Sequence, residues 1–240
     1  MERNKIYCID VLEGLHQLED NSVDLIITSP PYNKAGLNGK RKGSKWKKTI
    51  DYNGDPDVDN MPENEYQDWQ VAVLDECYRV LKPEGSLFYN HKPRTVYSQG
   101  YVINPLQWIF RTPFMLRQEI IWKRCGSPSF HRRRYLQDTE RIYWLTKQAR
   151  PRFNMDWTNS EFKDEVWTLC PDRKNPHPAP FPINIPDNII PNVAQGERIL
   201  VLDPFMGSGT VALSAIKNGC DYIGFEKFQL YVDMANERLG

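Results

Sequence analysis

The chain lacks the features that mark membrane-bound, secreted or strongly charged proteins. Lys and Arg together number 31, as do Asp and Glu, so the formal net charge is zero and bulk electrostatics indicate no nucleic-acid partner. No apolar run reaches the length of about 20 residues that a membrane span requires. Residues 1–5 lead into no signal-peptide core. These absences predict a cytoplasmic protein with no membrane partner.

Cysteine is also scarce, and its spacing is irregular. The five cysteines are Cys8, Cys77, Cys125, Cys170 and Cys220, and no two of them form a Cys-x-x-Cys motif. Zinc sites need such closely spaced ligands, and disulfide frameworks are typical of small secreted domains. We therefore expect reduced structural thiols and no metal site.

Strand and helix patterns alternate at both ends of the chain. Its 240 residues, 40% of them hydrophobic, suffice for a single domain spanning 1–240. The patterns predict strands at 6–9, 23–28, 86–89, 119–123, 141–146, 198–203 and 222–225. They predict helices at 11–18, 66–81, 105–112 and 210–218, with a short helix ending at 189 and a final amphipathic helix through 239. Prolines make 150–186 irregular. The predicted class is α/β with a mostly parallel sheet.

Positive charge gathers in two segments without helix or strand periodicity. The first lies in a long loop at 34–61, which we expect to be mobile, and the second lies within 125–138. A neutral protein with such segments is able to bind a phosphate backbone on one face, but solvated loops explain each segment equally well. The basic residues are Lys40, Arg41, Lys42, Lys45, Lys47, Lys48, Arg132, Arg133 and Arg134.

A glycine-containing turn follows the strand predicted at 198–203. The run Asp203–Thr210 (DPFMGSGT) allows the backbone to approach a ligand where open α/β sheets bind nucleotides. Glu226 follows Gly207 by nineteen residues, at the end of the next strand, where a carboxylate accepts hydrogen bonds from ribose hydroxyls. No third glycine arrives to receive a pyrophosphate, so a ligand without phosphate fits better. The alternative is a tight turn that binds nothing.

The strand predicted at 23–28 ends in two prolines. Prolines have no N–H group, so Ser29–Tyr32 (SPPY) offers carbonyl acceptors with few competing donors. An exocyclic amine needs such acceptors, because hydrogen bonds to the Ser29 side chain and the Pro30 carbonyl localise its lone pair on nitrogen. Tyr32 is placed to stack on a base, and positioning and electrostatics then supply most of the rate. Taken alone, the motif is also compatible with a turn that closes a strand.

Together the two motifs resemble those of the amino-methylating DNA methyltransferases in the permuted β group, where the catalytic motif precedes the cofactor motif. The resemblance covers nearly the whole chain, including 79–83 (RVLKP), 140–147 (ERIYWLTK) and 177–182 (HPAPFP). It implies a circularly permuted, Rossmann-like methyltransferase fold with small target-recognition inserts at 125–170. S-adenosylmethionine is the implied cofactor and double-stranded DNA the implied partner, with the target base flipped out of the duplex.

The resemblance also implies roles for individual residues. The implied catalytic residues are Ser29, Pro30, Pro31 and Tyr32. The implied cofactor-binding residues are Asp10, Thr28, His177, Ala179, Asp203, Phe205, Gly207, Ser208, Gly209, Thr210 and Glu226. The implied DNA-binding residues are Asn33, Trp46 and the nine basic residues named above. His177 is equally a loop histidine packed by prolines, and Trp46 is equally an anchor for its loop.

The motif variants bear on the target base. Ser-Pro-Pro-Tyr and His-Pro-Ala-x-Phe-Pro are forms that this family uses more often for cytosine N4, so cytosine leads and adenine N6 stays open. Motif order disfavours RNA or protein substrates. A catalytically dead DNA-binding subunit is disfavoured because every expected contact position holds a competent residue. A cognate restriction endonuclease and a homodimer are further expectations, with Trp108, Phe110 and Phe114 either at an interface or in the core.

Overall fold

The computed structural model describes residues 1–33, 60–96, 99–125, 135–170, 175 and 182–240. Its strands are β1 (Lys5–Cys8), β2 (Val23–Thr28), β3 (Leu81–His91), β4 (Arg94–Val96), β5 (Tyr101–Ile103), β6 (Met115–Arg124), β7 (Thr139–Thr146), β8 (Val166–Leu169), β9 (Leu200–Asp203) and β10 (Asp221–Glu226). Its helices are α1 (Val11–His16), α3 (Glu63–Val80), α4 (Leu106–Ile109), α5 (Asn184–Ala194), α6 (Thr210–Lys217) and α7 (Gln229–Leu239). None of these helices is both long and apolar enough to cross a bilayer.

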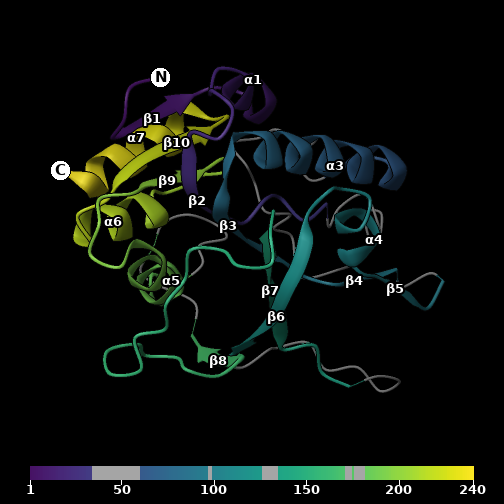
Figure 1. Ribbon diagram of the computed structural model, residues 1–240. Helices are drawn as coiled ribbons and strands as arrows, with labels where there is room; N and C mark the ends of the chain where they lie inside the picture. Colours follow the sequence, from purple (N-terminus) through teal and green to yellow (C-terminus); the bar gives the residue numbers. More distant parts are fainter. Residues whose placement is uncertain (34–59, 97–98, 126–134, 171–174, 176–181) are drawn as a thin grey trace.

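One eight-stranded sheet organises the fold, in the order β1-β10-β9-β2-β3-β7-β6-β8, and β4 pairs with β5 in a small second sheet (Figure 1). The first five strands in this order, β1, β10, β9, β2 and β3, are mutually parallel. β7 runs antiparallel between β3 and β6, and β8 adds in parallel to β6. The carboxyl ends of the parallel strands therefore lie at one edge, which is where open α/β sheets place their ligands.

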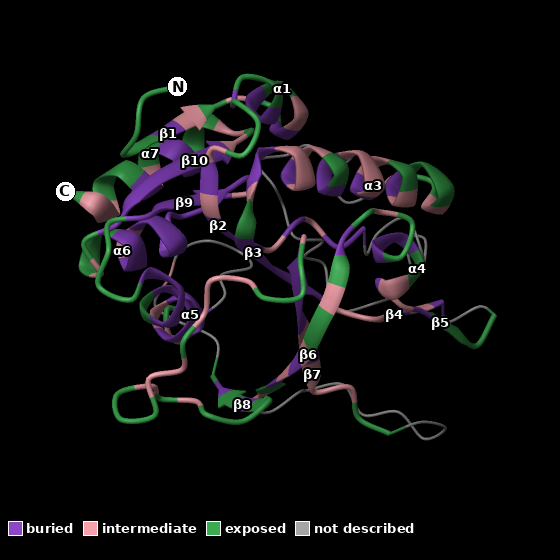
Figure 2. Ribbon diagram, viewed as in Figure 1, coloured by how far each residue is buried: buried purple, intermediate pink, exposed green. Residues whose placement is uncertain are grey.

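The central strands β2, β9 and β10 are buried on both faces, as the continuous apolar run of β2 predicts. Leu25 and Ile27 pack into the hydrophobic cluster that α5, α6 and α7 contribute to, whereas Ile26 packs into the cluster formed with α1, α3 and α4. This alternation follows from the two-residue period of a strand. Figure 2 shows β9 and β10 buried almost throughout between these layers. The predicted α/β class and parallel sheet are thus confirmed.

Several predicted boundaries are wrong. The segment 150–186, expected to be irregular, contains the short edge strand β8 and the start of α5. α5 continues to Ala194 with Pro191 inside it, instead of ending at 189. The helix expected at 105–112 is the four-residue α4, and β4 and β5 were not predicted. Short elements carry too few residues for a periodic pattern to reveal them.

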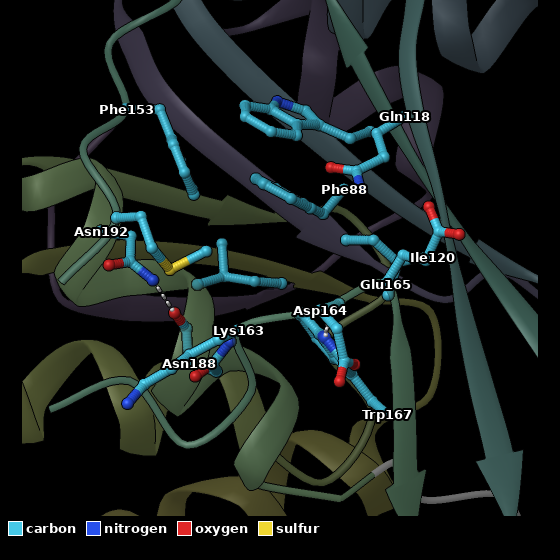
Figure 3. Close-up of a pocket in the computed structure, with 13 residues that line it drawn as sticks. Phe88, Gln118, Ile120, Phe153, Lys163, Asp164, Glu165, Trp167, Asn188 and Asn192 are labelled. Atoms are coloured by element: carbon cyan, nitrogen blue, oxygen red, sulfur yellow. Dashed lines mark hydrogen bonds between the residues drawn. The ribbon is translucent and has the colours of Figure 1, made fainter. Parts of the chain in front are cut away.

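Residues 150–165 lie across the sheet beside α5. Asn192 on α5 accepts a hydrogen bond from the Asp156 backbone N–H at 2.8 Å, and Asn188 exchanges two bonds with the backbone of Phe162. Between this segment and the sheet lies a hollow of about 410 Å³ (Figure 3). Its lining includes Phe88, Trp144 and Trp167 and no residue of the two predicted motifs. Residues 150–165, which belong to the predicted recognition region, are therefore held to α5 by hydrogen bonds.

Two of the five cysteines form a disulfide, so the expectation of reduced thiols is wrong for them. Cys125 and Cys170 are bonded, with Cα atoms 4.8 Å apart. Each directly follows one of two paired parallel strands, because Arg124 of β6 lies opposite Leu169 of β8. Parallel pairing brought the two thiols together across 45 positions of sequence, which linear spacing does not reveal. Cys8, Cys77 and Cys220 are free.

Candidate active site

The two predicted motifs meet because their strands are neighbours. β2 and β9 are parallel, with Ile26 opposite Leu202, so the residues that end them lie side by side. Thr28 Oγ1 donates a hydrogen bond of 2.8 Å to Asp203 Oδ1, and both side chains are buried. The predicted catalytic and cofactor-binding runs therefore lie together at the carboxyl edge of the sheet.

Asp203 has an unsatisfied acceptor. Its Oδ1 accepts from Thr28 and from the Phe205 backbone N–H at 3.0 Å, whereas its Oδ2 is buried with no hydrogen-bond partner among the described residues. Burial raises the pKa of this carboxyl to about 7, against the opposing effect of its two donors. Buried acceptors are normally paired, so Oδ2 fits a ligand that brings a donor, above all a cationic one.

The turn after β9 brings backbone groups close to Glu226. The Gly207 N–H donates to Glu226 Oε2 at 3.0 Å, and the Phe228 N–H donates to Oε1 at the same distance. Gly207 and Gly209 have φ values of 52° and 79°, in the left-handed region that favours glycine. Burial raises the pKa of Glu226. Arg238 of α7, which the sequence did not single out, donates to the Ser208 hydroxyl at 2.9 Å and to its carbonyl.

Asp10 lies near the same edge and caps a helix. β1 pairs with β10 so that Cys8 lies opposite Glu226, which places Asp10 just beyond the end of that pair. Its carboxylate accepts from the Leu12 backbone N–H at 2.9 Å, an N-cap contact for α1. Asp10 is exposed, so it also remains accessible to a ligand.

The catalytic motif is held by side chains of other strands. Ser29 Oγ lies 3.1 Å from the Tyr32 hydroxyl and 3.3 Å from Asn90 Oδ1 on β3. The Asn90 Nδ2 donates to the Arg141 carbonyl at 2.9 Å, which turns its Oδ1 toward Ser29 and Tyr32. Tyr32 also lies 3.0 Å from Glu140 Oε2 on β7. Asn90 and Glu140 were not predicted as site residues.

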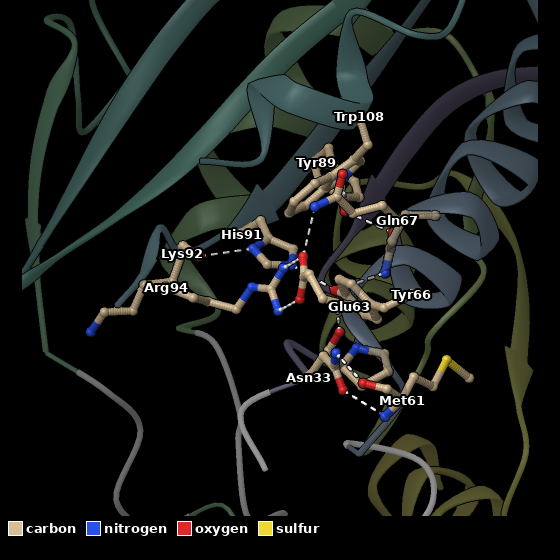
Figure 4. A network of polar contacts seen from close by, with 12 residues as sticks. Asn33, Met61, Glu63, Tyr66, Gln67, Tyr89, His91, Lys92, Arg94 and Trp108 are labelled. Atoms are coloured by element: carbon tan, nitrogen blue, oxygen red, sulfur yellow. Dashed lines mark hydrogen bonds and ion pairs between the residues drawn. The ribbon is translucent and has the colours of Figure 1, made fainter. Parts of the chain in front are cut away.

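The second proline of the motif is supported from α3. The Tyr66 hydroxyl donates to the Pro31 carbonyl at 2.7 Å, and it also lies 2.7 Å from His91 Nε2 (Figure 4). The His91 imidazole lies against the Tyr32 ring, with centroids 4.4 Å apart. Arg94, paired with Glu63, lies over the Tyr66 ring at 4.7 Å. The Ser29–Tyr32 loop is thus part of a buried polar network.

Asn33 joins the two ends of the predicted basic loop. Its Nδ2 donates to the Met61 carbonyl at 2.9 Å, and its Oδ1 accepts from the Met61 N–H at 2.8 Å (Figure 4). Asn33 is fully buried and has a positive φ of 51°, which asparagine tolerates better than most residues. DNA contact by Asn33 stays a prediction. In the structure its side chain instead binds the backbone of Met61.

Other predicted residues are not placed at the site. Lys40, Arg41, Lys42, Lys45, Trp46, Lys47, Lys48, Arg132, Arg133, Arg134, His177 and Ala179 lie outside the described residues. Trp108 and Phe114 are buried in the core, so they cannot form an interface, whereas Phe110 is 63% exposed. Within the described ranges no group of three or more His, Cys, Asp or Glu residues is arranged to hold a metal ion.

Comparisons of the sequence with known proteins show the family. A family model described as DNA methylase matches residues 23–237. The chain is 31% identical to the Type II methyltransferase M.HpaI of Haemophilus parainfluenzae, over 98% of this chain and 74% of that protein. It is 29% identical to the Type II methyltransferase M.BglII of Bacillus subtilis, over 98% and 69% respectively.

Two solved structures share the fold. The cytosine-N4-specific PvuII DNA methyltransferase superposes with a TM-score of 0.75 at 22% identity, over 100% of this chain and 87% of that one. The complex of M1.HpyAVI with SAM superposes with a TM-score of 0.65 at 23% identity, over 98% of each chain. At these identities the likeness establishes the architecture.

Proposed function

The chain belongs to the N6/N4 family of DNA methylases, and from that premise we propose that it transfers a methyl group from S-adenosylmethionine to the N4 amine of cytosine in duplex DNA. The observation that carries the proposal is the position of Ser29 Oγ, 3.3 Å from Asn90 Oδ1 and 3.1 Å from the Tyr32 hydroxyl. Asn90 Oδ1 only accepts, so the Ser29 hydroxyl is able to donate toward it and retain its oxygen lone pairs for an amine proton. The Pro30 carbonyl is the second expected acceptor.

The residues around Asp203 fit this cofactor. S-adenosylmethionine supplies an electrophilic methyl group and carries an ammonium, for which the unpaired Asp203 Oδ2 is a suitable acceptor. Glu226 is placed to accept from ribose hydroxyls, and the Gly207–Gly209 turn allows close backbone approach. Thr28 holds Asp203 in place and is followed directly by Ser29. M1.HpyAVI, which shares the fold, has been solved with SAM bound.

The chain's own groups work by placing the amine. Two acceptors, Ser29 Oγ and the Pro30 carbonyl, orient both amine protons and localise the nitrogen lone pair toward the methyl donor. Such positioning and electrostatic preorganisation supply most of the rate in reactions of this kind, so no strong base is required. Tyr32, with His91 against its ring, is the proposed stacking surface for the flipped base.

DNA is held, in this proposal, by the basic residues of 34–61 and 125–138. Lysines at 40–48 are expected to contact phosphates, and 125–170 is expected to read sequence. Single substitutions at 40–48 should weaken binding to all DNA and flatten its salt dependence. A change of site preference would instead place base contacts in this loop. A cognate restriction endonuclease and a homodimer stay predictions.

Nucleoside analysis decides the target base. Plasmid DNA is incubated with the protein and S-adenosylmethionine, digested to nucleosides and analysed by mass spectrometry. N4-methylcytosine is the expected product, and the cytosine-N4 specificity of the PvuII enzyme, which shares the fold, supports this expectation. Detection of N6-methyladenine alone would show that the target base is adenine and not cytosine. No methylated nucleoside from any DNA would contradict the proposed activity.

A further inference from the structure

We propose that Glu140 is a positioning residue for methyl transfer, acting through the Tyr32 hydroxyl to keep the Ser29 oxygen available as an acceptor. Arg124 holds the Glu140 carboxylate in place. The inference rests on the proposed function, because it assigns a role at the same catalytic motif. Neither Arg124 nor Glu140 belongs to that motif, and each lies about a hundred positions further along the chain.

The Glu140 carboxylate is buried, and its two oxygens have different hydrogen-bond partners. The residue is 5% exposed and lies on β7 opposite Trp122 of β6. Its Oε1 accepts from Arg124 NH1 at 2.9 Å, and its Oε2 lies 3.0 Å from the Tyr32 hydroxyl. A buried carboxylate loses its hydration, so it needs strong donors in return. One of those donors is a tyrosine of the catalytic motif.

A count of hydroxyl protons fixes the direction of the hydrogen bonds. The Tyr32 hydroxyl has one proton. Among the described residues, three oxygens lie within hydrogen-bond distance of it, namely Glu140 Oε2 at 3.0 Å, Asn90 Oδ1 at 2.9 Å and Ser29 Oγ at 3.1 Å. The carboxylate and the oriented amide oxygen only accept, so the Tyr32 proton goes to one of them and not to Ser29. Ser29 then donates its own proton to Tyr32 or Asn90. The Ser29 lone pairs remain for the target amine.

The negative charge of Glu140 strengthens this direction. A bond to an ionised acceptor is stronger than one to a neutral amide, so the carboxylate is the favoured acceptor of the Tyr32 proton. Glutamine at this position would have an NH₂ group that is able to donate to Tyr32. Only the neutral Asn90 oxygen would then compete with Ser29 for the Tyr32 proton. Donation from Tyr32 to Ser29 would become more frequent, and the serine oxygen would lose acceptor capacity toward the amine.

The ion pair also lies where the predicted recognition segment joins the sheet. Arg124 is the last residue of β6, its backbone N–H donates to the Asp138 carbonyl at 2.8 Å, and Glu140 follows two residues later on β7. The connection between β6 and β7 therefore leaves and re-enters the sheet beside the Arg124–Glu140 pair. The same pair contacts the catalytic motif through Tyr32.

A double-mutant cycle tests the role. The rate of methyl transfer from radiolabelled S-adenosylmethionine to DNA is measured in single turnovers for wild type, Glu140→Gln, Tyr32→Phe and the double variant. We expect Glu140→Gln to lower the rate by roughly 10- to 100-fold, less than the roughly 10²–10³-fold cost of removing a preorganised group that contacts the reacting atoms, because Glu140 acts through Tyr32. In the Tyr32→Phe background the same substitution should change the rate by less than about twofold, because the hydroxyl through which Glu140 acts is gone.

Glu119→Gln is the matched control. Glu119 forms a 2.6 Å ion pair with Arg141 across the same two strands, so its loss should cost stability without a comparable loss of rate. Thermal melting and the Kd of S-adenosylmethionine establish that each variant is folded and binds cofactor. An unchanged rate for Glu140→Gln, or an equal loss in both Tyr32 backgrounds, would overturn the inference. A wild type that methylates no DNA would instead refute the proposed function.

Discussion

Thr28 Oγ1 and Asp203 Oδ1 are joined by a 2.8 Å hydrogen bond although 175 positions separate them in the sequence. The bond connects the residue before the Ser-Pro-Pro-Tyr motif to the first residue of the glycine turn. It leaves the second Asp203 oxygen buried without a partner among the described residues. This contact between adjacent strands therefore joins the proposed amine-binding motif to the proposed cofactor-binding turn.

Asp203→Asn should weaken cofactor binding. The amide cannot offer a charged acceptor to an ammonium, and hydrogen bonds to charged groups contribute about 1.5–3 kcal/mol, so the Kd of S-adenosylmethionine should rise roughly 10- to 100-fold. Titration calorimetry measures it. The control is Asp221→Asn, a buried aspartate at the opposite end of adjacent β10 that pairs with Arg198. It should lower thermal stability and leave the Kd unchanged, and equal effects of both variants would contradict the assignment.

Cofactor affinity should depend on pH through Asp203. Burial raises the pKa of its carboxyl from 3.8 to about 7, so the folded protein favours the protonated form. The free energy of unfolding should accordingly fall as pH rises from about 4 to about 7. An ammonium needs the ionised form, so affinity for S-adenosylmethionine should rise with pH across 5.5–7, by up to tenfold per unit. Calorimetry at several pH values measures it. A pH-independent Kd, or equal pH dependence in Asp203→Asn, would be inconsistent with this assignment.

Substitution of Asn33 should disturb the basic loop without affecting the cofactor. Asn33→Gly keeps the positive φ but loses both bonds to Met61, so the free energy of unfolding should fall by about 1–3 kcal/mol. The KM for DNA should rise while the Kd of S-adenosylmethionine stays constant. Asn21 has a similar φ of 52° but is exposed, and its side chain accepts one exposed bond, from Lys147, so Asn21→Gly is the control for the backbone effect. Equal losses of stability in the two variants would show that the Met61 bonds contribute little.

The Cys125–Cys170 disulfide should stabilise the isolated protein. Cross-linking a loop of 45 residues contributes about 4 kcal/mol in the chain-entropy model. Urea denaturation with and without reductant, together with Cys170→Ser, measures the difference. Cys8→Ser is the control, because Cys8 is exposed and free. Five titratable thiols in protein purified without reductant would show that the bond does not form.

Ser29→Ala should separate catalysis from cofactor binding. Removal of one preorganised group aimed at the reacting centre typically costs about 10²–10³ in kcat. Thr28 and Asp203 are unaltered, so the Kd of S-adenosylmethionine should not change. Ser22, which precedes β2 at its other end, supplies the control Ser22→Ala. A kcat for Ser29→Ala within threefold of wild type would remove Ser29 from the list of amine acceptors.

Local sequence patterns predicted the strands that consist of a continuous apolar run. The buried run of β2, the strand β9 with its turn, and β10 were all predicted from apolar residues bounded by turn signals. β8 and the β4–β5 hairpin were missed, because these short strands are only partly buried and lack the bounded, fully buried run that marks the equally short β9. The turn at Gly207 and Gly209 was predicted from the close backbone approach that glycine allows, and the structure adds the positive φ of both residues.

The sequence alone was enough to identify the two motifs and their family. Each motif is a contiguous run of residues at the end of a predicted strand, so it can be recognised without knowledge of the tertiary structure. It did not reveal Asn90, Glu140 or Tyr66, nor the bond between Cys125 and Cys170. Those contacts depend on which strands are neighbours in the sheet. Strand order is set by the packing of both faces at once, so side chains far apart in sequence become partners only after the sheet has formed.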